Sequence, residues 1–326
     1  MISIRNLSKR YGTKYALNNI SFEVGDGEIV GFLGPNGAGK STTMNILTGY
    51  LSATEGTVEI NGLDILDNAY EAKKFIGYLP EQPPLYNDMT VAEYLNFVYD
   101  LKKCKLNRQK HLSEICEVVK LTDVSGRIIG NLSKGYKQRV GIAQALVGNP
   151  KVIILDEPTI GLDPKQIVEI RNLIRTLGID HTVILSTHIL SEVQAVCDRI
   201  VIINKGRIVA DERTEEIVSA VEGNRRLSVK ICGPSREVMS AVRGLNGVVK
   251  IESVGQQDAD SITYVVESES GVDIRKPLFN LLSQHGWAMI GSEPVGASLE
   301  DIFISLTERR ADTRSKKRRG FDKNND

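Results

Sequence analysis

The sequence predicts an α/β domain with a mixed-sheet core, followed by a smaller α+β domain, and three observations lead to this fold class. An apolar run passes through a glycine-rich turn into a helical pattern over residues 27–49. A second apolar run, residues 152–155, ends in two acidic residues. After about residue 220 the pattern changes to short alternating strands and helices.

The bulk composition allows two folded units and excludes some classes of partner. The chain has 326 residues, of which 41% are hydrophobic. Lys+Arg and Asp+Glu both number 41, so no protein-wide field attracts nucleic acid or an anionic membrane. The four cysteines lack CxxC spacing and the start lacks a signal-peptide pattern, which indicates free thiols in a reducing compartment. No run approaches the roughly 18 apolar residues of a membrane span, so work at a membrane would need a partner.

The first glycine-rich segment predicts a phosphate-binding loop between a strand and a helix. Gly34, Gly39, Lys40 and Ser41 fit the pattern G-x-x-x-x-G-K-[ST]. The glycines let successive backbone N–H groups face one anion, and the helix N-terminus adds positive potential. Lys40 would reach the β- and γ-phosphates and Ser41 would ligate Mg²⁺. The candidate nucleotide-binding residues of this loop are Gly34, Pro35, Asn36, Gly37, Ala38, Gly39, Lys40, Ser41 and Thr42.

The second apolar run predicts a strand buried on both faces of a parallel sheet, with Asp156 and Glu157 at its carboxyl end. Ligands of open α/β sheets bind at that edge. Asp156 can hold the magnesium shell and Glu157 can polarise the attacking water. An Asp-Glu pair can also simply mark where a strand meets solvent, but the phosphate loop upstream favours the catalytic interpretation.

A third strand, predicted over residues 182–185, is followed by His188. A lone histidine at such a place is commonly a capping or core residue. Here it lies at the same predicted sheet edge as Lys40 and Glu157, so a contact with the γ-phosphate is the better interpretation.

These segments, in this order, resemble the ATP-binding cassette (ABC) family over residue 1 to about residue 220. The motifs are "GPNGAGKST", "LSKGYKQ", "VIILDE", "GLD" and "STH", preceded by an aromatic residue in "KRYG". The resemblance implies a P-loop NTPase cassette with a helical subdomain, and ATP with Mg²⁺ as ligands. It also implies that Tyr11 stacks on adenine, that Asp163 lies in a dimer-facing loop, and that His188 is the switch histidine.

The signature "LSKGY" departs from the family pattern LSGGQ, because Lys134 and Tyr136 replace a glycine and the glutamine. Family cassettes pair head to tail, so that this segment closes on the γ-phosphate held by the partner. Ser133 and the N–H groups near Gly135 would begin a helix aimed at that anion. These groups are unchanged, so we interpret the departure as tolerated; the alternative is a helix N-cap without a partner ligand.

A second departure concerns the loop "PEQPP". The family has a glutamine here that touches magnesium and senses the transporter, and this chain has Glu81 with Gln82 next to it. Gln82 is the candidate site residue, and which of the two reaches the site stays open. The helical pattern that follows, to about Lys120, resembles the subdomain that meets the membrane partner.

The second half, residues 221–310, reads β-α-β-β-α-β, which predicts a small ferredoxin-like accessory domain without chemistry of its own. A closing helix is expected in "SLEDIFISLTERR", with Ser298 as its cap. The tail, residues 311–326, is basic. Such a tail is expected to be solvated, and contact with lipid headgroups is the functional alternative.

The resemblance implies an ATP-hydrolysing transporter subunit at the cytoplasmic face of the cell membrane. It would dimerise on ATP, with itself or with another cassette, and drive a separate integral membrane permease for export. Nucleic acid is not expected as a partner. The alternative is a soluble ABC-type ATPase that acts on nucleic acid or ribosomes; such proteins usually have two cassettes or a long coiled coil, which this chain lacks.

Overall fold

The computed structural model describes residues 1–217, 225–258, 260–269 and 271–295. It divides into two compact units, Met1–Thr214 and Glu215–Asp326. The boundary predicted from the sequence lies slightly later, after residue 220. The last residue of the first unit, Thr214, donates a hydrogen bond from its hydroxyl to the Cys197 carbonyl (2.7 Å).

The first unit is built on a six-stranded sheet in which only the edge pair β10–β9 is antiparallel. All residues of its central strands are buried, as expected for a sheet covered on both faces. The two strands that the sequence predicts before the Asp156–Glu157 pair and before His188 are confirmed. In spatial order the strands are β10 (Arg207–Arg213), β9 (Arg199–Asn204), β3 (Ile29–Leu33), β8 (Thr182–Thr187), β7 (Val152–Asp156) and β6 (Ile76–Leu79).

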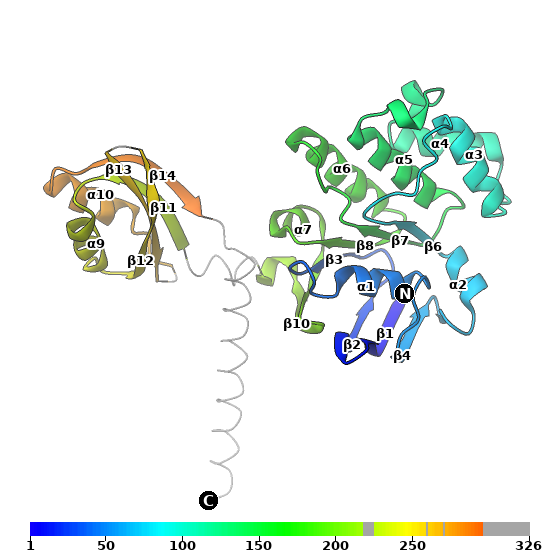
Figure 1. The fold of residues 1–326 in the computed structure, drawn as a ribbon, viewed down its shortest axis with the longest axis horizontal. Coiled ribbons are helices and arrows are strands. Elements are labelled where there is room, and N and C mark those ends of the chain that lie inside the picture. Colours follow the sequence, from blue (N-terminus) through cyan, green and yellow to red (C-terminus); the bar gives the residue numbers. More distant parts are fainter. Residues whose placement is uncertain (218–224, 259, 270, 296–326) are drawn as a thin grey trace, which may run out of the picture. The chain divides into compact units, whose positions relative to one another are not determined.

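A second, antiparallel sheet packs below the first, and helix α1 (Lys40–Leu47) lies between the two (Figure 1). Met44, Ile46 and Leu47 of α1 are buried in the core that joins both sheets. This packing fixes the start of α1 directly after β3. The strands of the second sheet, in spatial order, are β2 (Lys14–Val24), β1 (Ile2–Tyr11), β4 (Glu55–Ile60) and β5 (Leu63–Asp64).

Four of the remaining helices of the first unit, α3 to α6, start at a residue whose side chain caps the helix. Thr90 and Glu93 form a reciprocal capping box at the start of α3 (Val91–Leu101). Asp163 caps α6, and a proline occupies its first position. The helices are α2 (Ala69–Lys74), α3, α4 (Arg108–Val118), α5 (Lys134–Leu146), α6 (Pro164–Leu177) and α7 (Leu190–Val196), with 3₁₀ turns η1 (Thr122–Val124) and η2 (Ile129–Asn131).

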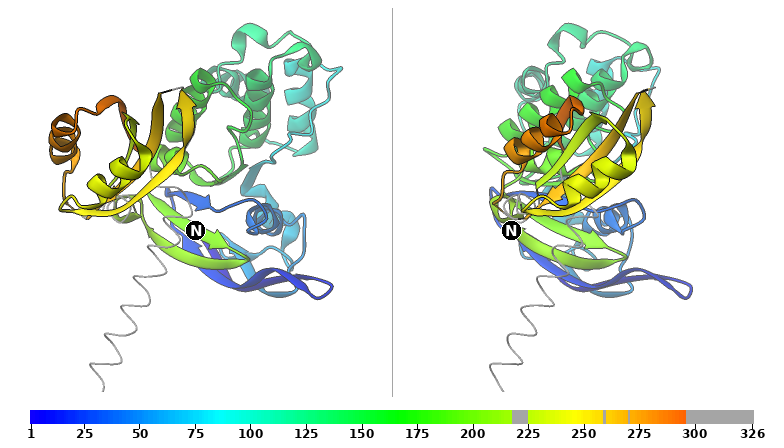
Figure 2. Two further views of the ribbon diagram at one scale, coloured as in Figure 1. Left: turned by 60° about the vertical axis from the view of Figure 1, so that its left-hand side comes forward. Right: turned by 90° about the vertical axis from the view of Figure 1, so that its left-hand side faces the viewer.

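The second unit has the β-α-β-β-α-β order expected from the sequence. Its sheet is antiparallel in the order β12-β13-β11-β14, which is the ferredoxin-like arrangement. Both helices lie on one face of the sheet (Figure 2), and both supply buried residues to one core. The elements are β11 (Arg225–Cys232), α9 (Ser235–Arg243), β12 (Val248–Asp258), β13 (Ser261–Ser268), α10 (Arg275–Gln284) and β14 (Ala288–Val295).

The predicted closing helix with its Ser298 cap and the basic tail lie outside the described residues. Among the helices that the structure describes, none has both the length and the apolar character needed to cross a membrane.

Candidate active site

The carboxyl ends of β3, β7 and β8 meet at one edge of the central sheet, and this brings the predicted motifs together. The Gly34 N–H, just after β3, donates to the carbonyl of Thr187 at the end of β8 (3.3 Å). The Glu157 N–H, just after β7, donates to the carbonyl of Ser186 (3.0 Å). The backbone itself therefore ties the phosphate loop and the acidic strand to the strand that precedes His188.

The loop between β3 and α1 requires glycine at two positions. Gly39 has φ +116°, and a β-carbon there would lie 2.7 Å from Leu17 Cδ2. At Gly34 a β-carbon would lie 2.4 Å from the carbonyl oxygen of Ile203. No side chain caps the start of α1, so its first N–H groups point into the loop without a side-chain acceptor. This is the backbone arrangement that binds anions at helix N-termini.

Lys40 lies across this loop with only 6% of its side chain exposed. Its Nζ donates to the carbonyls of Gly34 (2.9 Å) and Pro35 (3.4 Å). It also lies 3.3 Å from Glu157 Oε1. The lysine charge is thus buried next to a carboxylate, as a buried ammonium requires.

Glu157 is the centre of the cluster, because both Lys40 and His188 contact its carboxylate. His188 Nδ1 lies 3.0 Å from Glu157 Oε2, and the histidine side chain is 38% exposed while that of Glu157 is 7% exposed. Glu157 has φ +50°, a left-handed conformation that costs a non-glycine residue about 1–2 kcal/mol. Strained backbone of this kind is concentrated at functional sites.

Asp156 and Ser41 form the candidate magnesium site. The Asp156 carboxylate accepts a hydrogen bond from the Ser186 hydroxyl. Burial raises the pKa of Asp156, while hydrogen bonds from Ser186 and Ser41 act in the opposite direction. A carboxylate and a hydroxyl at this edge are the hard oxygen donors that Mg²⁺ prefers. Within the described residues, no three His, Cys, Asp or Glu side chains are grouped so that they could hold a metal ion. Phosphate and water oxygens would therefore complete the coordination shell of a Mg²⁺ ion held by Asp156 and Ser41.

Lys40, Ser41, Glu157 and His188 line a cleft of about 360 Å³, and Asp156 is not among its lining residues. This volume is within the usual range for small-molecule sites. Three of its lining residues are additions to the predicted phosphate-loop and catalytic set: Ala16 of β2, Glu81 after β6 and Ile160 after β7. Glu81, and not Gln82, is therefore the residue of this loop that reaches the cleft. The lining residues are Ala16, Asn36, Gly37, Gly39, Lys40, Ser41, Thr42, Glu81, Glu157, Ile160 and His188.

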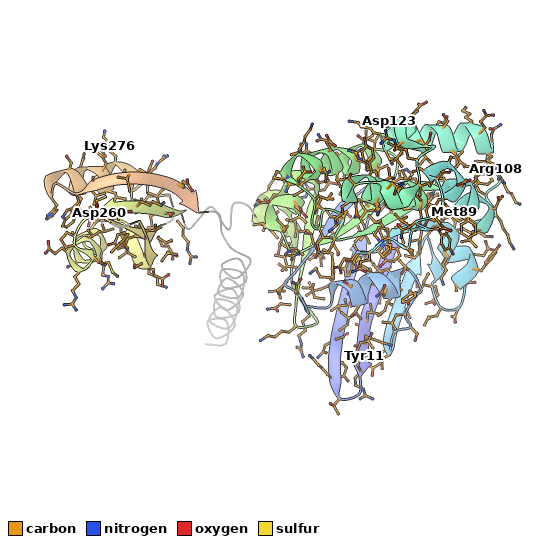
Figure 3. All side chains as sticks on the ribbon, turned by 45° about the horizontal axis from the view of Figure 1, so that its top comes forward. Tyr11, Met89, Arg108, Asp123, Asp260 and Lys276 are labelled. Carbon is orange, nitrogen blue, oxygen red and sulfur yellow. The ribbon has the colours of Figure 1, made fainter. Side chains whose placement is uncertain are left out.

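Tyr11 lies apart from this group. It ends β1 near the turn of the β1–β2 hairpin (Figure 3), and the residue is 54% exposed. The Lys9 ammonium lies 5.4 Å from the ring centroid. Tyr11 is not among the residues that line the cleft.

The signature residues and Asp163 also lie outside the cleft of the single chain, at the starts of two helices. Ser133 caps α5, and its hydroxyl accepts from the Tyr136 N–H (3.4 Å). Asp163 Oδ1 accepts from the Gln166 N–H (2.9 Å) at the start of α6. Both side chains therefore cap the helices that follow them; the cap at Ser133 agrees with the helix start expected there, and the cap at Asp163 is an addition.

The two helix starts pack against each other through glycines. A β-carbon at Gly161 would lie 2.1 Å from Lys134 Nζ, so the lysine side chain runs over this glycine. A β-carbon at Gly135 would lie 2.6 Å from the side chain of Gln166. The unusual signature lysine is thus seated on the "GLD" loop.

Sequence reasoning missed Glu192, a buried acid in α7 that accepts hydrogen bonds from Thr159 and Thr187. The available signal was its position, because it shares one helix face with Val193 and Val196, which are also buried. An acidic residue on an apolar face indicates a partner inside the protein.

Comparisons with known proteins agree with this arrangement. A family model described as ABC transporter matches residues 17–160. The bacitracin transport ATP-binding protein BcrA of Bacillus licheniformis is 32% identical over 94% of this chain and 97% of its own length. The linearmycin resistance ATP-binding protein LnrL of Bacillus subtilis (strain 168) is 32% identical over 95% of this chain and 99% of its own.

Among solved structures, the dimeric cassette MJ0796 in a post-hydrolysis state bound to ADP and Pi resembles this chain with a TM-score of 0.60. The two are 30% identical, and the match covers 66% of this chain and 99% of the other. The chain therefore belongs to the ABC transporter family, in which it is an ATP-binding and ATP-hydrolysing subunit.

Proposed function

We propose that this subunit binds ATP with Mg²⁺, closes as a dimer, and drives a separate integral membrane permease that exports its cargo. The observation that carries the catalytic part is the contact of Glu157 with both Lys40 and His188 at the edge of the cleft. Export is supported by the relatives that match nearly the whole chain, which include a Nod factor export ATP-binding protein of Burkholderia orbicola (strain AU 1054). We place the subunit at the cytoplasmic face of the membrane, held there by the permease.

Each residue of the cluster has a distinct proposed role in hydrolysis. The loop N–H groups and Lys40 hold the phosphates, and Glu157 orients the attacking water. His188, the more exposed of the pair, contacts the γ-phosphate. When bound by Ser41 and Asp156, Mg²⁺ would neutralise charge on the phosphate oxygens. Catalysis then rests on positioning and electrostatic stabilisation.

Residues outside the cleft take their proposed roles from a second copy of the chain or from the rest of the nucleotide. Ser133 and the N–H groups near Gly135 would close on the γ-phosphate held by the opposite copy. Asp163 would face the dimer interface, and Tyr11 would stack on adenine. In the loop after β6 we assign the cleft contact to Glu81 in preference to Gln82, because Glu81 lines the cleft.

The energy needed for closure is moderate. Shifting a dimer from 1:99 to 99:1 closed takes about 5.5 kcal/mol of differential binding, or about half of that for each of two bridging nucleotides. Charge-assisted hydrogen bonds to phosphate are of this order. ATP binding would therefore close the dimer, and hydrolysis would let it open.

The partner can be identified by affinity purification from a detergent extract of cells that make the tagged chain. We expect a protein with several membrane spans to co-purify in stoichiometric amount. Recovery of ribosomal RNA and ribosomal proteins without a membrane protein would favour the soluble alternative. The dimer is tested separately, by adding ATP to the Glu157→Gln variant and measuring its mass in solution.

A further inference from the structure

Glu192 is the buried acid that the proposed mechanism does not use. It lies in α7 with 1% of its surface exposed. One carboxylate oxygen accepts a hydrogen bond from the Thr159 hydroxyl (2.5 Å) and the other from the Thr187 hydroxyl (2.8 Å). An acidic side chain removed from water is costly unless its oxygens are satisfied, and these two hydroxyls satisfy them.

The two threonines flank the residues proposed to act on ATP. Thr187 immediately precedes His188, and its hydroxyl also accepts the Ile189 N–H (3.2 Å). The backbone on both sides of His188 is thereby held to Glu192. Thr159 follows Glu157 by two residues, in a turn that the Ile160 N–H closes onto the Glu157 carbonyl (3.2 Å). Glu192 therefore joins the segments that carry the two members of the Glu157–His188 contact.

The same connection reaches two further motifs. The Thr187 carbonyl accepts the Gly34 N–H of the phosphate loop (3.3 Å). The Thr159 carbonyl accepts the Leu162 N–H (3.2 Å), inside the "GLD" loop. Glu192 does not line the cleft, so it acts on these segments without touching the nucleotide. If packing alone were required, an apolar residue of similar volume would fill the space without the desolvation of a carboxylate.

We propose that Glu192 is a positioning residue for ATP hydrolysis, which holds Glu157 and His188 in register through Thr159 and Thr187. The inference rests on the proposed function, because it takes Glu157 and His188 as the residues that act on ATP. It predicts a loss that falls on kcat, since the phosphate loop keeps its own glycines and Lys40. A displacement of about 1 Å at a reacting group can lower turnover about a hundredfold.

The test uses the full chain and compares Glu192→Ala, Glu192→Gln and Thr159→Val. We expect Glu192→Ala to lower kcat about 10- to 100-fold, with KM and the Kd for a non-hydrolysable ATP analogue changed by less than about threefold. Glu192→Gln should keep turnover within about threefold of the unaltered chain, because a threonine hydroxyl can accept from the amide as well as donate to it. An equal loss in the Gln and Ala variants would contradict positioning by hydrogen bonds.

Thr214→Val provides the matched control for Thr159→Val. Thr214 is a buried threonine of the same unit, and its hydroxyl donates to the Cys197 carbonyl (2.7 Å), away from the cleft. Both variants lose one buried hydroxyl and keep the side-chain volume. We expect Thr159→Val to lower kcat and Thr214→Val to leave it unchanged. Equal turnover in these two variants would overturn the proposal. This comparison holds even if Glu192→Ala fails to fold.

A double-mutant cycle separates this inference from the proposed function. If Glu192 acts through His188, the loss of kcat in the double variant Glu192→Ala/His188→Ala should be smaller than the product of the losses in the two single variants. Fully multiplicative effects would overturn the inference. Normal turnover in Glu157→Gln would instead overturn the proposed function. If Glu157→Gln is inactive and Glu192→Ala has normal turnover, only the positioning role of Glu192 is overturned.

Discussion

The two units of the chain differ in what their interiors contain. The cassette unit buries several charged side chains, and four of them, Lys40, Asp156, Glu157 and Glu192, lie at or next to one sheet edge. The described part of the second unit buries no charged side chain, and its core is formed by aliphatic residues around Tyr264. Buried charge is costly, so its concentration in one unit indicates where the chemistry lies.

The largest effect is expected from a substitution among the buried charges of the cassette unit. Glu157→Gln keeps the shape of the side chain but removes its charge beside Lys40. We expect ATP hydrolysis to fall by two to three orders of magnitude, roughly the loss seen when a general base is removed, while ATP binding persists. Hydrolysis and nucleotide binding are measured on the same preparation. Lys40→Ala is the companion variant, in which binding itself should be lost; unchanged affinity there would contradict the phosphate-loop assignment.

A destabilising substitution in the core of the second unit should leave ATP hydrolysis unchanged. Tyr264 is fully buried in its core, so Tyr264→Ala should destabilise that unit by about 3–5 kcal/mol. Each unit has its own core, and we therefore expect ATP turnover by the purified chain to stay within about twofold. Two thermal transitions, of which only one moves, would sharpen the comparison. A parallel loss of turnover would show that the units depend on each other.

A smaller effect is expected at the unusual signature lysine. Lys134→Gly restores the glycine of the family pattern and leaves the Ser133 cap and Gly135 unchanged. We expect turnover to change by less than about fivefold, because helix N-termini bind anions through backbone N–H groups that this variant keeps. Steady-state kinetics would check this, with Ser133→Ala as the contrasting variant. A hundredfold loss in Lys134→Gly would show that the departure from the family pattern is functional.

The smallest change concerns one hydroxyl. Within the described residues, the buried Tyr264 hydroxyl has no hydrogen-bond partner. Removing an unsatisfied buried polar group relieves its desolvation cost, so Tyr264→Phe should stabilise the second unit by up to about 1–2 kcal/mol. Chemical denaturation of the two proteins measures the difference. Destabilisation by a similar amount would mean that the hydroxyl has a partner after all.

Much of the site could be predicted because its signals are local. The phosphate loop combines glycines that the backbone geometry requires with a lysine and a serine at fixed spacing, and the acidic pair directly follows an apolar strand. The structure brings Lys40, Ser41, Glu157 and His188 to one cleft, as the common sheet edge predicted. The β-α-β-β-α-β order of the second unit was equally readable from periodicity.

The remaining features depend on contacts between distant segments. Glu81 and Gln82 are adjacent polar residues in an exposed loop, and only the path of the chain after β6 decides that Glu81 reaches the cleft. Tyr11 has the expected sequence position, but the single chain leaves its ring exposed near a hairpin turn. Glu192 contacts Thr159 across 33 positions of sequence, a separation that no short pattern reports.

The conformation of Gly161 beneath Lys134 has a consequence for how this position can vary. The lysine nitrogen occupies the space that any side chain at 161 would need, and Gly161 has φ +67°, which most other residues avoid. Lys134 is exposed and its Nζ is the free end of a flexible side chain, so it can swing aside for a side chain at 161, whereas the positive φ at 161 stays. In laboratory evolution of this chain, position 161 should therefore stay glycine or change to asparagine, whatever residue 134 becomes.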